Sequence, residues 1–515
     1  MNRKIILHLI CVIAGVTGLA ILLSGGVSFL MKDRLNDSIT LSLTGLILFL
    51  SALCGGLLTR TKSTAERQFG FREGFAIVAL GWLVVSMTGS LPFIVTADMH
   101  WYDALFETAS GFSTTGASVI DSTLTLRNGS SLPNGVESLP YGVLFWRSLT
   151  NWLGGMGIVV LTIAILPLLN IGGQTLFNAE TTGVKSSDSK IAPRIASSAK
   201  ILWLLYLGMT AVQVVFLLLG GMPFFDSICH SFGTIATGGF STKQNSIAYY
   251  NSAYIDTVIT IFMFLAGCNF LLHIRLFSGK FLAFWKDEEF RIYLYILLFA
   301  TTVITLYLTF SSTITDPVAK VPLYHNFWNS LRIASFQCVS IMTSTGFSTG
   351  DYCSWPTVTG IILFLLMFPG GCGGSTSGGL KCVRGILLFK HSVTEVRRCI
   401  FPHLIPDVRL NGVRLENNVI QRTLGFAILY FCIFLVFACL ISLLCPMAEM
   451  DFATALSASL SCLSNIGPGF GNIGPSYSFG WITPAAKVLL SFEMIVGRLE
   501  LFTILVLFLP SFWKK

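Results

Sequence analysis

The chain has 515 residues, of which 53% are hydrophobic and only 11% are charged, and its mean hydropathy is +0.74. Soluble domains carry about 25% charged residues, so this composition excludes a protein with a single core surrounded by water and predicts an integral membrane protein. The formal net charge is +8, but the basic residues are spread over short loops between apolar runs, which excludes a nucleic-acid-binding surface as their explanation.

Ten apolar runs are long enough to cross about 30 Å of hydrocarbon. They lie near residues 5–31, 38–59, 73–97, 141–169, 200–222, 251–277, 291–311, 357–389, 419–445 and 483–510. The first run has a basic start, as a signal peptide has, but it is about twice as long as the roughly 7–15 apolar residues of a typical signal and has no clear cleavage site. We therefore expect it to be a retained membrane helix.

The distribution of Lys and Arg predicts the orientation. An even number of spans places both ends of the chain on one side of the membrane. The loops and ends on that side hold 24 of the 33 Lys and Arg residues, whereas the opposite side holds five. Because basic loops favour the cytoplasm, we predict that both termini are cytoplasmic.

Polar stretches of small residues interrupt the apolar sequence four times, always on the predicted outer side. Their central glycines, Gly116, Gly239, Gly346 and Gly467, are 123, 107 and 121 residues apart. A segment too short to span the membrane precedes each stretch, at 103–112, 225–235, 325–341 and 451–463. The recurrence predicts a unit of span, short helix, glycine loop and span, repeated four times.

Four such loops can surround a single axis, because non-helical backbone at membrane depth is tolerated only where it lines water or is buried in protein. Rings of their carbonyl oxygens would replace the hydration shell of a monovalent cation. The C-terminal end of each short helix would add about half a negative charge, and glycine would let the backbone approach the ion. The alternative, four external turns rich in small residues, is disfavoured by the matching positions of the loops.

Six motifs along the chain carry a family resemblance. They are "FREGFAIVALGW" (71–82), "FETASGFSTTGAS" (106–118), "FWRSLTNWLGGMGIVVL" (145–161), "GGCGGSTSGGLK" (370–381), "SNIGPGFG" (464–471) and "GRLELFT" (497–503). Together they resemble the TrkH family, the membrane subunits of bacterial Trk potassium-uptake systems, within a superfamily that includes Ktr and HKT transporters. The two leading spans are similar to the Trk branch, since Ktr-type subunits generally lack them.

This resemblance implies an all-α integral membrane fold, in which four pseudo-repeated units of span, pore helix, filter loop and span surround one axis. Two extra transmembrane helices precede the four units. The corresponding domains are 1–70 for the two N-terminal helices, 71–170 for pore repeat 1, 171–278 for repeat 2, 279–390 for repeat 3 with an intramembrane gate loop, and 391–515 for repeat 4.

The resemblance also implies a K+ selectivity filter, in which K+ is the bound and transported ion. Its residues are Thr114, Thr115, Gly116, Thr237, Gly238, Gly239, Ser344, Thr345, Gly346, Asn465, Ile466 and Gly467. The second glycine is open between Gly238 and Gly239, and alignment with the Gly-Phe-Ser of the third loop favours Gly239. Some HKT proteins that prefer sodium have serine at the first filter position, so Gly116 favours potassium. Pro468 in the fourth loop and the absence of a TVGYG sequence make a looser filter plausible.

Six glycines between residues 370 and 379 interrupt the inner span of the third repeat. Each glycine disfavours a helix by roughly 1 kcal/mol relative to Ala, so we predict an unwound intramembrane loop. A packing notch between helices is the main alternative, and a phosphate-binding loop would need a different pattern. The resemblance implies a gate formed by Gly370, Gly371, Gly373, Gly374, Ser375, Gly378, Gly379 and Arg498.

Arg498 stands out because an ionisable group at membrane depth is costly and normally faces the bundle interior or water. It either forms a structural salt bridge with Glu493 or Glu500, or it places a positive charge below the filter that repels a cation. A similar arginine in the family supports the second role.

Three further cations at membrane depth are given structural roles. Arg147 and Arg332 are interpreted as anchors of packing or of short-helix ends, and Lys487 as a side chain that snorkels outward.

The partners follow from the resemblance, which implies a homodimer in the lipid bilayer and a cytosolic ring of TrkA-like nucleotide-binding regulatory subunits. No covalent cofactor is expected on this chain, and the nucleotide, NAD or ATP/ADP, is expected on the partner subunit only. The polar segment 170–200 and the basic segment 381–422 are the predicted docking surfaces. Attraction to anionic lipid would also explain the charge of the second segment.

The leading function is therefore K+ translocation across the bacterial inner membrane, through a carbonyl filter gated from inside. The alternative is a secondary active symporter that couples K+ to Na+ or H+. A symporter would favour acidic groups or histidines at the membrane midplane, where Glu493 and Glu500 are the main candidates. An enzyme is disfavoured, because the sequence has no nucleophile motif, metal-ligand cluster or nucleotide-binding loop.

Overall fold

The computed structural model describes residues 3–59, 71–165, 191–311, 316–318, 323, 325–403 and 407–513, and helices dominate these residues. The first half contains α1 (Arg3–Leu30), α2 (Leu35–Leu58), α3 (Phe71–Gly89), α4 (Leu91–Val95), α5 (Trp101–Phe112), α6 (Tyr141–Ile165), α8 (Ile191–Leu219), α9 (Phe224–Ile235), α10 (Ala253–Ala266) and α11 (Phe270–Phe277). The second half contains α12 (Ala283–Lys286), α13 (Glu288–Ser311), α14 (Phe327–Met342), α15 (Thr357–Leu366), α16 (Cys382–Ile400), α17 (Asn417–Leu444), α18 (Phe452–Ser464), α19 (Pro484–Arg498), α20 (Phe502–Leu505) and α21 (Pro510–Trp513). Most of the predicted docking segment 170–200 lies outside the described residues.

Six described segments are long and apolar enough to cross a membrane as single helical units. They are Arg3–Leu30, Leu35–Leu58, Arg72–Val95, Lys200–Leu219, Glu288–Phe310 and Asn417–Leu444. Large apolar side chains on these segments are exposed, among them Leu204, Phe299 and Leu443. Lipid rather than water therefore accounts for their outer faces, and the predicted multi-pass helical membrane fold is confirmed.

Three apolar runs are not continuous helices: the breaks within 251–277 and 483–510 correct the sequence-based assignment, whereas the break within 357–389 is the predicted glycine loop. Residues 251–277 form α10 and α11, which bend by 98° at their junction, where Asn269 caps α11 by accepting from Leu271 N at 2.9 Å. Residues 357–389 are split between α15 and α16 by a non-helical loop. Residues 483–510 break after α19, where Leu501 has a left-handed φ of 37°. Hydropathy counts apolar side chains but does not detect the caps and turns that end a helix.

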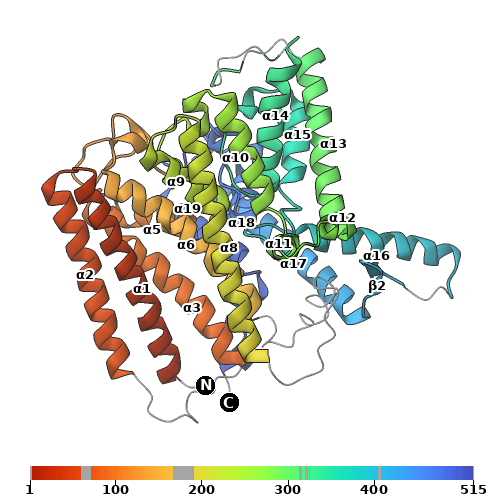
Figure 1. Cartoon of the computed structure of the whole chain (residues 1–515), viewed down its shortest axis with the longest axis horizontal. Helices are drawn as coiled ribbons and strands as arrows, with labels where there is room; N and C mark the ends of the chain where they lie inside the picture. The colour runs from red at the N-terminus through yellow and green to blue at the C-terminus, as the bar shows by residue number, and fades with distance from the viewer. Residues whose placement is uncertain are drawn as a thin grey trace.

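The four short helices α5, α9, α14 and α18 confirm the four short segments predicted from the sequence. They lie inside the bundle, while the α1–α2 pair flanks one side and α16 projects from the other (Figure 1). Three of them pack against the helix that follows another glycine loop: α9 against α6, α14 against α10, and α5 against α19. Because α5 and α19 come from opposite ends of the chain, the last of these contacts brings the first and fourth units together.

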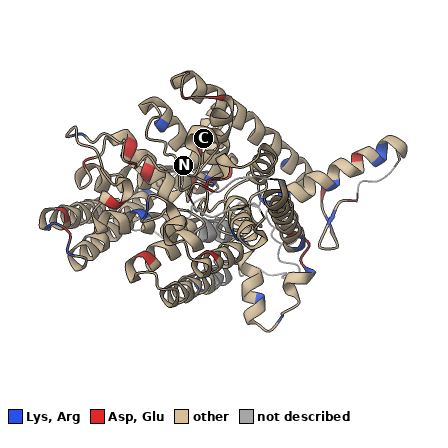
Figure 2. Ribbon diagram, turned by 90° about the horizontal axis from the view of Figure 1, so that it is seen from above, with Lys and Arg blue, Asp and Glu red and all other residues tan. Residues whose placement is uncertain are grey.

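A small β-hairpin follows α16. Strands β1 (Arg409–Leu410) and β2 (Val413–Arg414) pair antiparallel around Asn411 and Gly412, whose φ values are 51° and 80°. An Asn-Gly pair with two positive φ values is typical of a tight hairpin turn. A hydrogen bond from Arg409 holds the pKa of Asp407 below its usual range. Figure 2 shows Lys and Arg along the arm formed by α16 and this hairpin.

Candidate functional site

The four short helices end in the same way. A residue within two positions of the end of each helix has a left-handed backbone: Thr114, Thr237, Ser344 and Asn465 have φ values of 54°, 53°, 54° and 56°. The N–H of the next residue donates to the carbonyl five positions earlier at 2.8–2.9 Å, which with the left-handed residue forms a Schellman motif. A left-handed Thr or Ser is strained, and such strain clusters at functional sites.

A glycine with positive φ follows each motif, and it decides the second filter position. Gly116, Gly239, Gly346 and Gly467 have φ values of 81°, 70°, 81° and 104°. Gly238 does not share this conformation, and a Cβ there would meet the side chain of Asn151 at 2.6 Å. Gly239 is therefore the structural counterpart of the other three glycines.

The four glycines form a closed ring. A Cβ on Gly116 would collide with the carbonyl oxygen of Gly238, and a Cβ on Gly239 would collide with that of Thr345. The same relation joins Gly346 to the carbonyl oxygen of Ile466, and Gly467 to that of Thr115 at 2.6 Å. Each glycine thus lies against the residue that precedes the glycine of the next loop, and the fourth loop meets the first. Eight of the twelve predicted filter residues make these contacts, and the other four, Thr114, Thr237, Ser344 and Asn465, are the left-handed residues directly before them.

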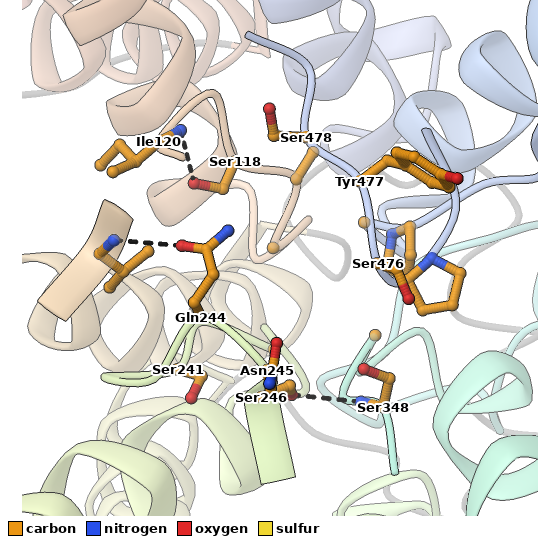
Figure 3. Close-up of a pocket in the computed structure, with 18 of the residues that line it drawn as sticks. Ser118, Ile120, Ser241, Gln244, Asn245, Ser246, Ser348, Ser476, Tyr477 and Ser478 are labelled. Atoms are coloured by element: carbon orange, nitrogen blue, oxygen red, sulfur yellow. Dashed lines mark hydrogen bonds between the residues drawn. The ribbon is translucent and has the colours of Figure 1, made fainter. Parts of the chain in front are cut away.

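A cavity of about 100 Å³ opens above the ring and is lined by all four glycines. Figure 3 shows its polar side chains, which include Ser118, Ser241 and Ser348. Hydrogen bonds cross between loops at its wall: Gln244 Oε1 accepts from Val136 N at 3.1 Å, and Ser246 Oγ accepts from Ser348 N at 3.2 Å. The cavity is therefore a polar vestibule whose floor is glycine backbone.

Arg147 clamps the first two loops together, which confirms its predicted anchoring role. Its Nε donates to Glu107 Oε1 at 2.5 Å and its Nη1 to the Ser241 carbonyl at 2.7 Å. The guanidinium carbon also lies 3.8 Å from the ring centre of Phe240. Glu107 in turn accepts from Val119 N at 3.1 Å, so one buried ion pair positions backbone on both loops.

Two more ion pairs join neighbouring units, and one of them corrects a prediction. Lys487 does not snorkel outward: it is 3% exposed, and its Nζ donates to Asp103 Oδ1 at 2.6 Å. The carboxylate of α5 makes the interior more favourable for this ammonium group than the membrane edge. Arg332 pairs with Asp256 at 2.9 Å, which confirms its role as an anchor of short helix α14.

Residues 367–381 contain no helix, as the glycines predict, and they lie directly beneath the ring. The N–H of Gly378 donates to Ser344 Oγ at 2.6 Å, and Thr376 Oγ1 lies 3.3 Å from Thr237 Oγ1. Thr376 Oγ1 also donates to the carbonyl of Ile235 at 3.1 Å. The loop is therefore bound to the left-handed residues of two filter loops.

Internal contacts give this loop a defined shape rather than leaving it as open coil. Gly370, Gly374 and Gly379 have positive φ values of 65°, 72° and 77°. Ser377 Oγ accepts from Gly371 N at 2.9 Å, and Ser375 Oγ donates to the Cys372 carbonyl at 2.6 Å. The predicted gate residues Gly370, Gly371, Gly373, Gly374, Ser375, Gly378 and Gly379 all belong to this folded loop.

Arg498 lies beneath the ring and forms neither of the predicted salt bridges. Its side chain is held by two carbonyls, Thr376 at 2.7 Å through Nη1 and Gly154 at 3.4 Å through Nη2, and the residue is 3% exposed. Glu493 instead accepts from Ser459 Oγ at 2.5 Å, and Glu500 from Arg384 at 2.6 Å. The chain turns after α19, which directs Glu500 to a different helix. The positive charge of Arg498 therefore has no carboxylate partner among the described residues.

Two contacts at the site were not predicted. Asn465 Nδ2 donates to Thr115 Oγ1 at 3.0 Å and to the Met494 carbonyl at 2.9 Å, so the fourth loop is tied to the first by a side chain. Glu289 accepts from two N–H groups of the gate region, Gly373 and Val383. The only sequence signal for the second contact is an acidic residue that follows a basic loop and precedes an apolar span.

Four loops that converge beneath one polar vestibule define a helical membrane protein with a central path for a small ion. The chain belongs to the TrkH family, whose model, described as a cation transport protein, matches residues 43–515. It is 37% identical over 498 residues to the Trk system potassium uptake protein TrkH of Salmonella typhimurium, which covers 96% of each chain. It is 35% identical over 473 residues to TrkG of Escherichia coli, which covers 91% of each. The crystal structure of the potassium transporter TrkH from Vibrio parahaemolyticus matches with a TM-score of 0.84 and 33% identity over 100% of both chains.

Proposed function

We propose that this chain is the membrane subunit of a Trk-type potassium-uptake system and conducts K+ across the bacterial inner membrane. The observation that carries the proposal is the closed ring, in which each filter glycine packs against the backbone of the next loop. Four re-entrant loops have no other reason to meet at one axis inside an apolar bundle. The names of the relatives, which are potassium-uptake proteins, support K+ as the ion.

In this proposal the filter is formed by the left-handed residue, the residue after it and the glycine of each loop. Backbone carbonyls there replace the water that K+ sheds, because fixed dipoles solvate a cation without reorganising. The Schellman motifs fix the loops before the ion arrives, and the C-terminal ends of the short helices favour positive charge nearby. The chain accordingly divides into the two leading helices, 1–70, and the four repeats, 71–170, 171–278, 279–390 and 391–515.

The loop of residues 370–379 and Arg498 are proposed as the gate. The loop occupies the space directly below the filter and hydrogen bonds to filter residues Ser344 and Thr237 through Gly378 and Thr376. The guanidinium of Arg498 is bound to the same loop through the Thr376 carbonyl. A cation leaving the filter therefore meets both backbone and a fixed positive charge, so conduction requires the loop to move.

Both termini are proposed to be cytoplasmic. They lie at the same end of the molecule (Figure 1), and the loops predicted on that side carry 24 of the 33 Lys and Arg residues. Basic loops favour the cytoplasmic side of a membrane.

The partners are proposed to be a second copy of the chain and a cytosolic nucleotide-binding regulatory ring of the TrkA type. Exposed apolar residues recur along α16 at helical spacing: Phe389, Val393, Val396 and Ile400. Such a stripe on a projecting helix suits a second copy. The basic arm suits a regulatory partner, which would carry the nucleotide, NAD or ATP/ADP.

A coupled symporter is the second candidate, because of Glu493. This residue is fully buried in α19, and its Oε2 has no hydrogen-bond partner among the described residues. A buried carboxyl group with a free oxygen inside a transport bundle is a candidate proton carrier.

The deciding experiment uses the purified chain in liposomes, with K+, Na+ and proton gradients set independently. We expect K+ flux that follows the K+ gradient alone, which indicates conduction. Flux that also requires a Na+ or proton gradient supports symport, and loss of the proton dependence in Glu493→Gln would assign the carrier. Absence of K+ flux under every gradient, with the protein verified as folded and inserted, refutes the proposal.

A further inference from the structure

One carboxylate oxygen binds the backbone on both sides of the part of the gate loop that contacts the filter. Glu289 stands in the first turn of α13 and is 4% exposed. Its Oε1 accepts from Gly373 N at 2.7 Å and from Val383 N at 2.9 Å. These two N–H groups flank the part of the loop that touches the filter and Arg498. A single acceptor atom therefore holds the backbone on both sides of that part.

The two hydrogen bonds to Glu289 are expected to be strong, because their acceptor is a carboxylate. Val383 is the second residue of α16, where backbone N–H groups have no partner within the helix. Gly373 is in the non-helical loop, where no helix or sheet hydrogen bond competes for its N–H. Hydrogen bonds to an ionised acceptor stabilise about twice as much as neutral ones, and a buried N–H that loses its acceptor is costly. Replacement of Glu289 would therefore release the loop at Gly373 and the start of α16 at Val383 together.

The residues that precede Glu289 are bound to the cytoplasmic hairpin. Asn411, at the hairpin turn, accepts from Glu288 N at 2.7 Å through Oδ1 and donates to Asp287 Oδ2 at 3.1 Å through Nδ2. The N–H of Asn411 donates to Glu288 Oε2 at 3.2 Å, and Lys390 of α16 pairs with Glu288 Oε1. Figure 1 shows α12, the lower end of α13 and α16 meeting at this point, with β2 beneath α16.

We propose that Glu289 is a positioning residue that holds the gate loop under the filter, and that Asn411 connects it to the hairpin through residues 287–288. The proposal rests on the gate function assigned above to residues 370–379. A partner that displaces the hairpin would pull on the start of α13 and move the acceptor that closes the loop. The coupling path is then a short chain of hydrogen bonds, not a rearrangement of the whole bundle.

The test measures the position of the loop and the flux separately, in liposomes that contain the full chain. Cys372 lies in the loop and is 1% exposed, whereas Cys338 in α14 is 0% exposed and away from it. Reaction of each thiol with N-ethylmaleimide, followed by mass spectrometry, therefore reports loop release with an internal reference. K+ flux and the K+/Na+ ratio are measured on the same samples.

For Glu289→Gln we expect Cys372 to react about tenfold faster, because the charge-assisted bonds become neutral ones. Basal K+ flux should rise, while the reaction of Cys338 and the K+/Na+ ratio stay unchanged. Glu289→Ala should show a larger effect. Glu449→Gln, which removes one exposed carboxylate outside the gate loop, α13, α16 and the hairpin, is the matched control and should behave as the unmodified chain.

The outcomes separate this inference from the function on which it rests. If the unmodified chain carries no K+ flux, the proposed function fails. If it conducts, but Glu289→Gln and Glu289→Ala leave both the flux and the reactivity of Cys372 unchanged, the positioning role is overturned. Asn411→Ala should speed the reaction of Cys372 by a smaller factor, and an unchanged rate in that variant would overturn the connection to the hairpin.

Discussion

Substitution of Gly116 by Ser tests the filter directly. Gly116 has a φ of 81°, and an added Cβ would collide with the Gly238 carbonyl oxygen and lie 3.2 Å from the Gly238 carbonyl carbon. A non-glycine residue in left-handed conformation costs roughly 1–2 kcal/mol. Either the strain remains, or the peptide of the second loop moves away from the ring. If the carbonyl ring loses about 1.4 kcal/mol of its preference for K+, the K+/Na+ ratio falls about tenfold.

The assay is the ratio of K+ to Na+ flux in liposomes, compared with Gly129→Ser as the control. Gly129 has a nearly identical φ of 79°, but a Cβ there meets no atom within 4 Å. The control thus carries the same backbone strain without the collision in the ring. We expect a lower ratio for Gly116→Ser and an unchanged ratio for Gly129→Ser. Equal ratios in the two variants would remove Gly116 from the filter.

Three further predictions address the proposed gate and an ion pair between neighbouring units. Arg498→Ala should raise basal K+ flux, by roughly thirtyfold if the charge contributes about 2 kcal/mol to the barrier, and should leave the K+/Na+ ratio intact; unaltered flux would give Arg498 a structural role only. Deletion of residues 373–378 should leave the path permanently leaky in the same assay, and a tight deletion variant would contradict the gate assignment. Lys487→Met should destabilise the chain by about 3–5 kcal/mol, because Asp103 is left buried without its partner. Thermal unfolding in detergent measures this loss. Lys487→Met combined with Asp103→Leu should recover much of it, because no charge is then left unpaired. A Lys487→Met variant as stable as the unmodified chain would contradict the prediction.

The four glycine loops proposed as the filter could be predicted from the sequence because their conformation is local. Each loop follows a short helix, contains small residues and ends in a glycine that needs positive φ, and all of these leave a signal within about fifteen residues. The ambiguity between Gly238 and Gly239 was resolved only by backbone conformation, since both residues are compatible with the sequence pattern. The non-helical, glycine-rich loop of residues 370–379 was predictable for the same local reason.

The contacts of the charged residues could not be predicted in the same way. Arg498 has two nearby acids in sequence, Glu493 and Glu500, yet it binds the carbonyls of Thr376 and Gly154. Glu289 lies 84 and 94 residues from the N–H groups it binds. Such partners depend on how separate helices pack, and hydropathy and spacing carry no information about that. The breaks within α10–α11 and after α19 were missed because each lies inside a longer stretch that is apolar enough on average to count as one span.

The two ion pairs between helices of neighbouring units suggest how the units are kept in order. Lys487 is the fourth residue of α19 and Asp256 is the fourth residue of α10, so the two occupy the same position on equivalent helices with opposite charge. Their partners on the short helices are reversed accordingly, Asp103 on α5 and Arg332 on α14. If α19 packed against α14, Lys487 would face Arg332, and if α10 packed against α5, two carboxylates would meet. Because an unpaired or repelled charge in this interior is far more costly than at a surface, each of these two pairs favours its own partner and disfavours the other.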